Sequence, residues 1–445
     1  MLERCAVLDW AASGAMSLTG QPDGAPVPST APVLAMLGAV TEELAQVTRD
    51  TGTRVRTDPA ELITARAALA GYTRRGRISA GGSSFLLRSA DGWCALTLSR
   101  PDDLTAVPAI LGVLGLNEAA LPVEPRATLA AEVLAAAALA QPAEELVAAA
   151  QLLGVPAAAL PTAPPRTERG WPSWRAARIA PPSPAAGLAG AVVADLSSMW
   201  AGPLCGRLLG LAGADVIKVE SSDRPDGARS GNPGFFDWLH AGHRSLAVDF
   251  KTEPGRAVLR ALLGVADIVI EASRPRALAA LGLAPDMIPH PDGQVWLSIT
   301  GYGRAVPERV AFGDDAAVAG GLVGWTSGGP APEPVFCADA IADPLAGVCG
   351  ALAVARSVAA GGGELIDLSM REVAAAFAAA PAPAHGPHEV RPDGLVACPR
   401  SGRQQAVLPP RRPAPSARPA TPPAADLGAD TRAVLAWLAD QVPAC

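Results

Sequence analysis

Short apolar runs alternate with helical patterns over the middle of the chain. The apolar runs at 190–198, 214–220, 244–250, 266–272, 294–301 and 364–370 have the pattern of buried strands. Helical periodicity lies between or after them, at 202–213, 254–264, 274–282, 343–360 and 371–380. Short buried strands that alternate with helices are typical of a parallel sheet covered on both faces. The pattern therefore predicts an α/β fold whose large domain is a Rossmann-like, mostly parallel sheet.

The first 160 residues have a different pattern. They are rich in alanine, and a glycine loop at Gly81-Gly82 precedes two strand-like runs within 85–98, joined at Asp91-Gly92. An Asp-Gly pair between two such runs indicates a β-hairpin. Helical patterns follow at 127–141 and 143–153. We therefore expect residues 1–160 to form a smaller, small-domain-like α+β region.

Proline content marks the remaining boundaries. Residues 161–188 are proline-rich and predict an extended linker, which leaves 189–382 as the large domain. Residues 383–445 form a Pro/Arg-rich tail. Within this tail we expect 409–425 to be disordered and 430–442 to form a short terminal helix.

Composition narrows the class of partner and the compartment. The net charge of −7 and the pI near 5.4 argue against a nucleic-acid partner. No bilayer-length stretch is free of charges and helix breakers, and the start lacks a signal-peptide pattern. The 7 cysteines are scattered, without a C-x-x-C pair. We therefore expect a cytoplasmic protein without a membrane partner, whose cysteines are small buried hydrophobes.

Familiar nucleotide, hydrolase and metal motifs are missing. The chain lacks G-x-G-x-x-G after a strand, G-x-x-x-x-G-K-[ST] and G-x-S-x-G. His240 and His243 are three residues apart but have no carboxylate or cysteine at ligand spacing. These absences predict no metal site and no common dinucleotide or ATP site.

One carboxylate stands out by its position. Asp343 precedes Pro344 at the start of a predicted helix, where Asp at the N-cap and Pro at the next position favour helix initiation. Asp343 is thus either only a helix cap or an ionised carboxylate that the helix N-terminus holds near the strand ends, where it can act as a nucleophile. Asp314-Asp315 open another predicted helix, and Asp339 is a competing candidate.

Seven collinear segments resemble the family III CoA-transferases, which include formyl-CoA and carnitine CoA-transferases and alpha-methylacyl-CoA racemase. The matching segments are VVADLSSMWAGPLCGRLLGLAGADVIKVES (192–221), HAGHRSLAVDFKTEPGRAVLRAL (240–262), ADIVIEASRPRALAALGL (266–283), VWLSITGYG (295–303), GDDAAVAGGLVGWTSG (313–328), ADPLAGVCGALAVA (342–355) and IDLSMREV (366–373). They occur in the order of the family. The small-domain segments 76–104 and 142–160 also resemble it, but they precede the large domain, which implies a circular permutation.

The resemblance implies roles for individual residues. The nucleophilic aspartate of the family falls on Asp343. Its CoA-binding positions fall on Trp200, Ala201, His240, His243, Arg244, Ala272, Ser273, Arg274, Tyr302 and Asp315. The histidine that the racemases of the family need for their two-base proton transfer is replaced by Asp314, which disfavours racemisation.

The implied function is transfer of CoA from an acyl-CoA thioester to a carboxylic acid, through aspartyl anhydride and aspartyl-CoA intermediates. Coenzyme A is then a substrate, no cofactor is required, and a homodimer is expected. Two alternatives stay open at this point: an acyl-CoA racemase or isomerase of the same fold, and a non-catalytic CoA-binding protein.

Overall fold

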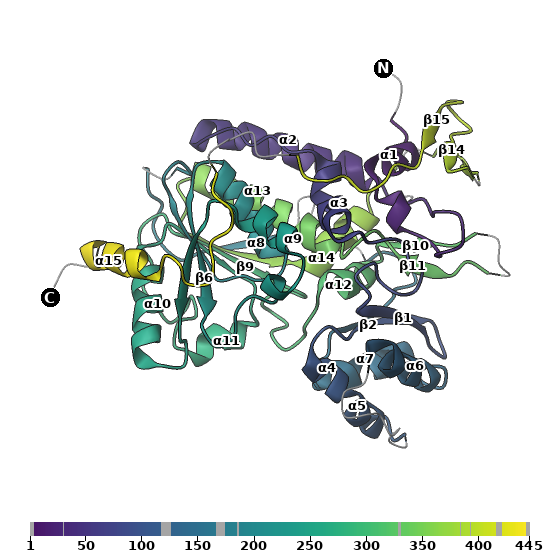
Figure 1. Ribbon diagram of the computed structural model, residues 1–445, viewed down its shortest axis with the longest axis horizontal. Helices are drawn as coiled ribbons and strands as arrows, with labels where there is room; N and C mark the ends of the chain where they lie inside the picture. The colour runs from purple at the N-terminus through teal and green to yellow at the C-terminus, as the bar shows by residue number, and fades with distance from the viewer. Residues whose placement is uncertain are drawn as a thin grey trace.

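The computed structural model describes residues 4–29, 31–116, 126–165, 174–184, 187–327, 331–382, 384–391, 393–414 and 421–441. Its centre is a seven-stranded sheet with the order β4-β12-β9-β8-β5-β6-β7 (Figure 1). The strands are β4 (Arg175–Arg178), β5 (Val192–Asp195), β6 (Asp215–Ser221), β7 (Arg244–Val248), β8 (Ile268–Glu271), β9 (Val295–Thr300) and β12 (Glu364–Ser369). All neighbours pair in parallel except β4, which runs antiparallel to β12. The predicted α/β fold with a mostly parallel sheet is therefore confirmed.

The strand order reverses direction beside β5. From β5 the chain proceeds outward through β6 and β7, whereas β8, β9 and β12 lie on the other side of β5. In open parallel sheets, ligands bind where the carboxyl ends of two such diverging strands leave a crevice. The loops after β5 and β8 are therefore the first places to look for a binding site.

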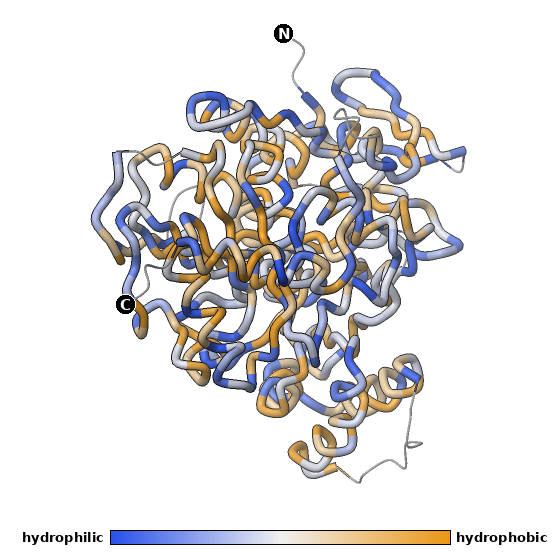
Figure 2. The backbone as a smooth tube through the Cα atoms, turned by 60° about the vertical axis from the view of Figure 1, so that its left-hand side comes forward, coloured by the Kyte–Doolittle hydropathy of each residue, from blue (hydrophilic) through white to orange (hydrophobic). Residues whose placement is uncertain are grey.

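Helices cover both faces of the sheet. The helices of the large domain are α8 (Ala201–Leu211), α9 (Pro233–His240), α10 (Glu253–Val265), α11 (Pro275–Ala280), α12 (Gly313–Ala319), α13 (Ala342–Ala359) and α14 (Met370–Ala378), with a 3-10 turn at Gly227–Ser230. One apolar core lies between the sheet and the α8, α13 and α14 side, and another lies on the α10 side. Figure 2 shows hydrophobic stretches gathered towards the centre.

Helix α13 packs directly against α8. A Cβ at Gly347 of α13 would lie 2.5 Å from the carbonyl oxygen of Ala201, so only glycine permits this approach. Among the described residues, α13 is the one helix with the length and hydropathy of a membrane span, and 83% of that window is buried inside the protein. It is the central helix of the core.

The predicted hairpin is present in a separate lobe. Strands β1 (Ser84–Arg88), β2 (Trp93–Thr97) and β3 (Ala157–Ala159) form an antiparallel sheet, as predicted for the first two. Helices α4 (Pro101–Thr105), α5 (Val107–Val113), α6 (Ala127–Ala138) and α7 (Ala143–Leu152) cover it. This lobe has its own apolar core, which includes Leu96, Leu134 and Leu146.

The predicted region 1–160 does not form one unit. Helices α1 (Ala6–Ser13), α2 (Val33–Thr51) and α3 (Pro59–Ala70) pack on the large-domain core, and only the β1–β3 lobe stands apart. The reason is the apolar face of α2, where Leu37, Val40 and Leu44 are buried. Sequence periodicity shows such a face but not its partner, which here is α13.

The predicted linker and tail are also more ordered than expected. Strand β4 belongs to the 161–188 linker, where it covers the outer edge of β12. In the tail, β13 (Glu389–Val390), β14 (Leu395–Ala397) and β15 (Gln404–Ala406) form a small sheet beside α1, and α15 (Thr431–Gln441) packs near α10. The described parts of 409–425 contact the body, since the backbone N–H of Arg411 donates to Thr64 Oγ1 at 3.0 Å.

The packing of α2 on α13 gives the first prediction. Leu37 is fully buried, so Leu37→Ala removes core contacts and leaves a cavity, which we expect to cost about 2–5 kcal/mol of unfolding free energy. Leu152→Ala, at a position that is 74% exposed on α7, is the matched control and should cost less than about 0.5 kcal/mol. Chemical denaturation followed by tryptophan fluorescence measures both. Equal effects would mean that α2 is not part of the core.

Candidate active site

Asp343 lies in the first turn of α13 but does not cap it. The helix begins at Ala342, the N-cap position is Ile341, and no side-chain cap is formed. The predicted N-cap role of Asp343 is therefore wrong by position, because the chain enters the helix earlier than the Asp-Pro pair indicates. The carboxylate instead faces α12: a Cβ at Gly313 would lie 2.4 Å from Asp343 Oδ2. Asp343 keeps part of its surface exposed, so a ligand can reach it.

A partly buried arginine from α3 lies beside this carboxylate. Arg66 Nη1 donates to Asp339 Oδ1 at 3.1 Å, and the Asp339 side chain is completely buried. The guanidinium carbon lies 5.5 Å from the ring centres of both Tyr72 and Trp200. The charges of Asp339, Asp314 and Asp343 all raise the pKa of Arg66 against its desolvation. Arg66 is thus the positive charge with which all three aspartates interact. No motif or spacing in the sequence indicated that it belongs to the site.

Burial dominates the protonation of the cluster. Desolvation raises the pKa of Asp343 to about 8, because the opposing charge of Arg66 is outweighed and Asp314, Asp315 and Asp339 add repulsion. The same cause raises the pKa of Asp339 to about 6 and that of Asp315 to about 7. Near neutral pH, Asp343 is therefore mostly protonated, which differs from the expectation that the helix N-terminus keeps it ionised.

Asp314 and Asp315 join the two lobes. Ser84 Oγ of β1 donates to Asp314 Oδ2 at 2.9 Å, and Thr97 Oγ1 of β2 donates to Asp315 Oδ1 at 2.9 Å. The backbone N–H of Phe312 also donates to Asp315 Oδ1, at 2.9 Å, which caps the start of α12 as predicted. Asp315, which the resemblance assigns to CoA binding, is fully buried. In the structure its carboxylate holds the β1–β2 hairpin.

The glycine loop of the hairpin lobe reaches the same cluster. A Cβ at Gly81 would lie 3.1 Å from Arg66 Nη2. On the other side of the cluster, Ala338 and Ala340 have φ angles of 57° and 43°. Non-glycine residues seldom adopt this left-handed conformation, and such strain is concentrated at functional sites. The backbone around Asp339 is thus held in an unfavourable conformation by its surroundings.

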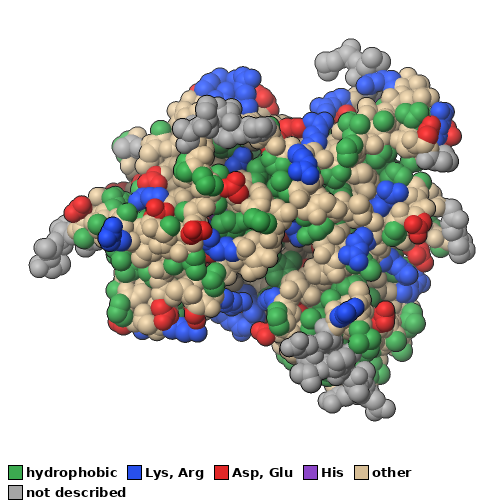
Figure 3. All heavy atoms as spheres, viewed as in Figure 1, with side chains coloured by type: hydrophobic (Ala, Val, Ile, Leu, Met, Phe, Trp, Pro, Cys, Tyr) green, Lys and Arg blue, Asp and Glu red, His purple; other side chains and the backbone are tan. Residues whose placement is uncertain are grey.

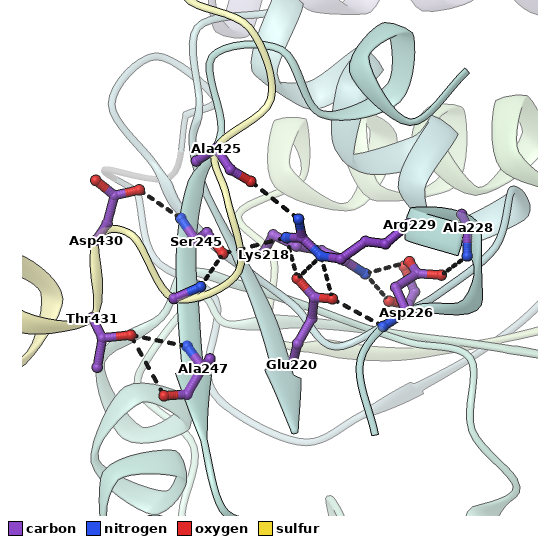
Figure 4. Close-up of polar contacts among 12 residues, drawn as sticks. Lys218, Glu220, Asp226, Ala228, Arg229, Ser245, Ala247, Ala425, Asp430 and Thr431 are labelled. Atoms are coloured by element: carbon purple, nitrogen blue, oxygen red, sulfur yellow. Dashed lines mark hydrogen bonds and ion pairs between the residues drawn. The ribbon is translucent and has the colours of Figure 1, made fainter. Parts of the chain in front are cut away.

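Trp200 and Ala201 lie at the crevice after β5, where the topology places a ligand. Trp200 packs edge-on against Phe235. Next to the loop that carries Trp200, Lys218 Nζ and Asp226 Oδ2 form an ion pair at 3.0 Å. Asp226 Oδ1 accepts from the backbone N–H of Met199 at 3.0 Å. Figure 4 shows Lys218 and Asp226 within the polar network that continues to Glu220 and Arg229. This network sets the backbone that presents Trp200.

Ala272, Ser273 and Arg274 follow β8 on the other side of the same crevice. Arg274 is the N-cap residue of α11. Desolvation lowers its pKa, and the nearby charges of Arg276, Arg100 and Arg224 lower it further. Figure 3 shows Lys and Arg side chains gathered over the region of α11, next to a recess between the lobes. Arg100 and Arg224 were missed in the sequence because each comes from a different element.

Tyr302 lies at the carboxyl end of β9 and lines a cavity of ≈ 330 Å³. Its ring packs under Arg309, whose guanidinium carbon is 4.4 Å from the ring centre, and its hydroxyl donates to the carbonyl of Ala157 at 3.4 Å. Gly303, Asp367 and Arg371 line the same cavity. Tyr302 is therefore at the carboxyl edge of the sheet, and its role in CoA binding stays a prediction.

The remaining predicted residues lie elsewhere. Arg244 begins β7, its Nε donates to Asp215 Oδ1 at 3.0 Å, and its guanidinium covers Trp437. Asp215 starts β6, so this pair is at the amino edge of the sheet. His240 and His243 are buried, and desolvation lowers the pKa of His243 to about 3. The structure does not bring these three side chains to the crevice.

Comparison with known proteins agrees with this architecture. Residues 188–412, just over half of the chain, match the family described as "CoA-transferase family III". A succinate–glutarate CoA-transferase of Agrobacterium fabrum is 32% identical over 212 residues, which cover 43% of this chain and 53% of that protein. The human succinyl-CoA:glutarate CoA-transferase is 32% identical over 149 residues, 31% of this chain and 33% of that protein. The chain thus spans about half or less of the length of these relatives.

Solved structures give a similar result. A CAIB/BAIF family protein from Brucella suis is 31% identical, with 44% of this chain and 55% of that chain covered and a TM-score of 0.38. Rv3272 from Mycobacterium tuberculosis is 30% identical, with 44% and 57% covered and a TM-score of 0.39. From the match over residues 188–412, the chain belongs to the family III CoA-transferases.

Proposed function

We propose that this protein transfers CoA from an acyl-CoA thioester to a carboxylic acid, with Asp343 as the nucleophile. The observation that carries the proposal is the placement of Asp343. Its carboxylate is partly exposed and desolvated, and it belongs to the cluster that includes Trp200, Arg66 and Gly81. A desolvated, fixed carboxylate is a far better nucleophile than one in water.

The proposed reaction has two halves. An oxygen of ionised Asp343 attacks the thioester carbonyl carbon, the C–S bond breaks, and CoA leaves as the thiolate from a mixed anhydride. The thiolate then attacks the aspartyl carbonyl of that anhydride, which forms aspartyl-CoA and releases the donor acid. The acceptor carboxylate attacks aspartyl-CoA, and the thiolate returns to the acceptor acyl carbon, which regenerates Asp343. No group beyond the two substrates is consumed.

Neighbouring residues have supporting roles in this scheme. Each tetrahedral intermediate carries an oxyanion, and the positive Arg66 beside the cluster stabilises negative charge there. The backbone N–H of Gly81 is a further candidate donor, whereas that of Gly82 already donates to the carbonyl of Ser79 at 2.8 Å. The arginines around Arg274 are suited to the phosphates of CoA, since guanidinium groups bind phosphate oxygens in pairs. Asp314 is held by Ser84 and the backbone N–H of Ala340, in place of the histidine of the racemases.

Other properties that the resemblance implies stay predictions. These are the homodimer, the cytoplasmic location, the absence of a catalytic cofactor and the circular permutation of the small-domain segments. The cytoplasmic location is supported by the described cysteines, all of which are free thiols. The names of the relatives support dicarboxylic acids such as succinate and glutarate as the first acceptors to assay.

The first functional prediction concerns the nucleophile. Asp343→Asn keeps the shape of the side chain but removes its nucleophilic oxygen, so we expect CoA transfer to fall by at least about 10³-fold with an unchanged circular dichroism spectrum. Wild-type protein incubated with acyl-CoA and then hydroxylamine should yield a hydroxamate on Asp343, located by peptide mass spectrometry. A modified Asp339, or transfer at the wild-type rate by the Asn variant, would refute the assignment.

The pH dependence of transfer tests the protonation of the site. Because only ionised Asp343 attacks and its pKa is raised to about 8, the ionised fraction rises with pH up to that value. We expect kcat/KM to increase roughly fiftyfold between about pH 6 and 8 and then to level off. Assays with buffer alone correct for thioester hydrolysis. A plateau that already begins near pH 5 would contradict the raised pKa.

The arginine cluster gives a third test. Arg274→Gln removes one guanidinium from the proposed phosphate site, so the KM for acyl-CoA should rise about tenfold while kcat changes little. The KM for the matching acyl-pantetheine, which lacks the nucleotide phosphates, should not change. Arg256→Gln, on α10 in a surface pair with Glu253, is the control. Equal effects on both substrates would exclude a phosphate contact at Arg274.

A further inference from the structure

Two cysteines and two histidines gather where the N-terminal segment meets the small β13–β15 sheet. Cys5 precedes α1, His385 and His388 precede β13, and Cys398 follows β14. Cys5 is 383 positions from His388 in the chain, yet the ligand atoms of Cys5, His388 and Cys398 all lie within 4.8 Å of one another. The cluster is separate from the acidic site around Asp343.

The contacts within the cluster join the sulfur and nitrogen atoms directly. Cys5 Sγ lies 3.0 Å from His388 Nε2, and Cys398 Sγ lies 3.2 Å from His385 Nδ1. Zinc bonds of about 2.3 Å to sulfur and 2.0–2.1 Å to nitrogen place ligand atoms of a tetrahedral site roughly 3.3–3.8 Å apart. The two observed separations are close to that range, so small side-chain rotations open the cluster to an ion.

Burial favours a metal over a chance contact. Cys5, Cys398 and His385 are buried, with exposed fractions of 4%, 1% and 8%, and His388 is partly exposed. Within the described part of the chain, His385 Nε2 is buried without a hydrogen-bond partner. Two imidazoles and two thiols at such a site are unusual for an apolar core, whereas together they form a ligand set typical of structural zinc.

The backbone after β14 orients the side chain of Cys398. Backbone N–H groups of Arg400 and Ser401 hydrogen-bond to the Cys398 side chain. The turn closes with the N–H of Gly402 donating to the carbonyl of Cys398 at 3.0 Å, and Gly402 has a φ of 65°. N–H donors directed at a cysteine sulfur fix its position, as the outer-shell contacts of metal sites do.

We propose that Cys5, His388, Cys398 and His385 bind a structural zinc ion. Two thiolates and two imidazoles neutralise and enclose Zn²⁺, and this soft, nitrogen-containing set disfavours Mg²⁺ and Ca²⁺. The ion adds to the packing of Val396, which joins this small sheet to the main apolar core. Strands β13, β14 and β15 have only two or three residues each, and their sheet packs beside α1. The proposal does not depend on the proposed catalytic function.

Metal analysis of the full-length protein tests the proposal. Protein purified under reducing conditions from zinc-supplemented cells should contain about one zinc per chain, and removal of zinc by a chelator should lower Tm. Reconstitution with Co²⁺ should give the thiolate charge-transfer band and the intense visible bands of a tetrahedral site. Absence of both zinc and the cobalt spectrum overturns the proposal, as does a Cys5–Cys398 disulfide that persists in the metal-free reduced preparation.

Variants identify the ligands. Cys5→Ala, Cys398→Ala and His388→Ala should each reduce bound zinc to less than about 0.1 per chain, and His385→Ala should weaken zinc affinity at least about tenfold. Cys349→Ala, a buried cysteine on α13, is the control and should keep full zinc content. Full zinc content in the Cys5 or Cys398 variant refutes the site, and unchanged affinity in the His385 variant removes that residue from the ligand set. The cobalt spectrum of the wild type decides the question if a variant fails to fold.

Discussion

The pairing of Arg66 with the buried aspartates is the interaction on which the site depends. Asp314, Asp315, Asp339 and Asp343 lie in one desolvated region, where like charges repel strongly. A single guanidinium from α3 partly offsets this repulsion, and it is bonded to Asp339. For that reason α3 must pack on the large domain rather than with the hairpin lobe. Helix α3 is thus part of the site as well as of the core.

The raised pKa of Asp343 links the stability of the folded protein to the reactivity of its carboxylate. A carboxyl group whose pKa is raised by folding stabilises the protein below its ordinary pKa, and this contribution is lost as the pH rises towards 8. The ionised, reactive form is therefore also the less stable one. Binding of a ligand that excludes water and adds hydrogen bonds shifts this balance.

The sequence predicted what depends on local pattern. Strands, helices and the Asp91-Gly92 hairpin follow from periodicity and turn chemistry, whereas the Asp-Pro pair at Asp343 placed the N-cap of α13 two residues late, because the cap is Ile341. What it missed depends on contacts between distant segments. Arg66 and Asp339 are 273 residues apart, the arginines near Arg274 come from separate elements, and α2 finds its partner only in three dimensions. Cys5 and Cys398 were missed for the same reason. They come together only in the folded chain, so no C-x-x-C spacing marks them.

The outermost strands of the large sheet are β4, which is exposed, and β7. Strand β4 pairs with β12 on one side, and on the other the C-terminal segment crosses β7 (Figure 4). There Asp430 Oδ2 accepts from the N–H of Ser245 at 2.8 Å, and Thr431 Oγ1 accepts from the N–H of Ala247 at 3.1 Å. Side chains from the tail thus occupy backbone donors that an unprotected strand would offer to another molecule. The C-terminal segment therefore blocks strand pairing between molecules at β7. Loss of this segment would favour aggregation, and it would do so before any change in the crevice.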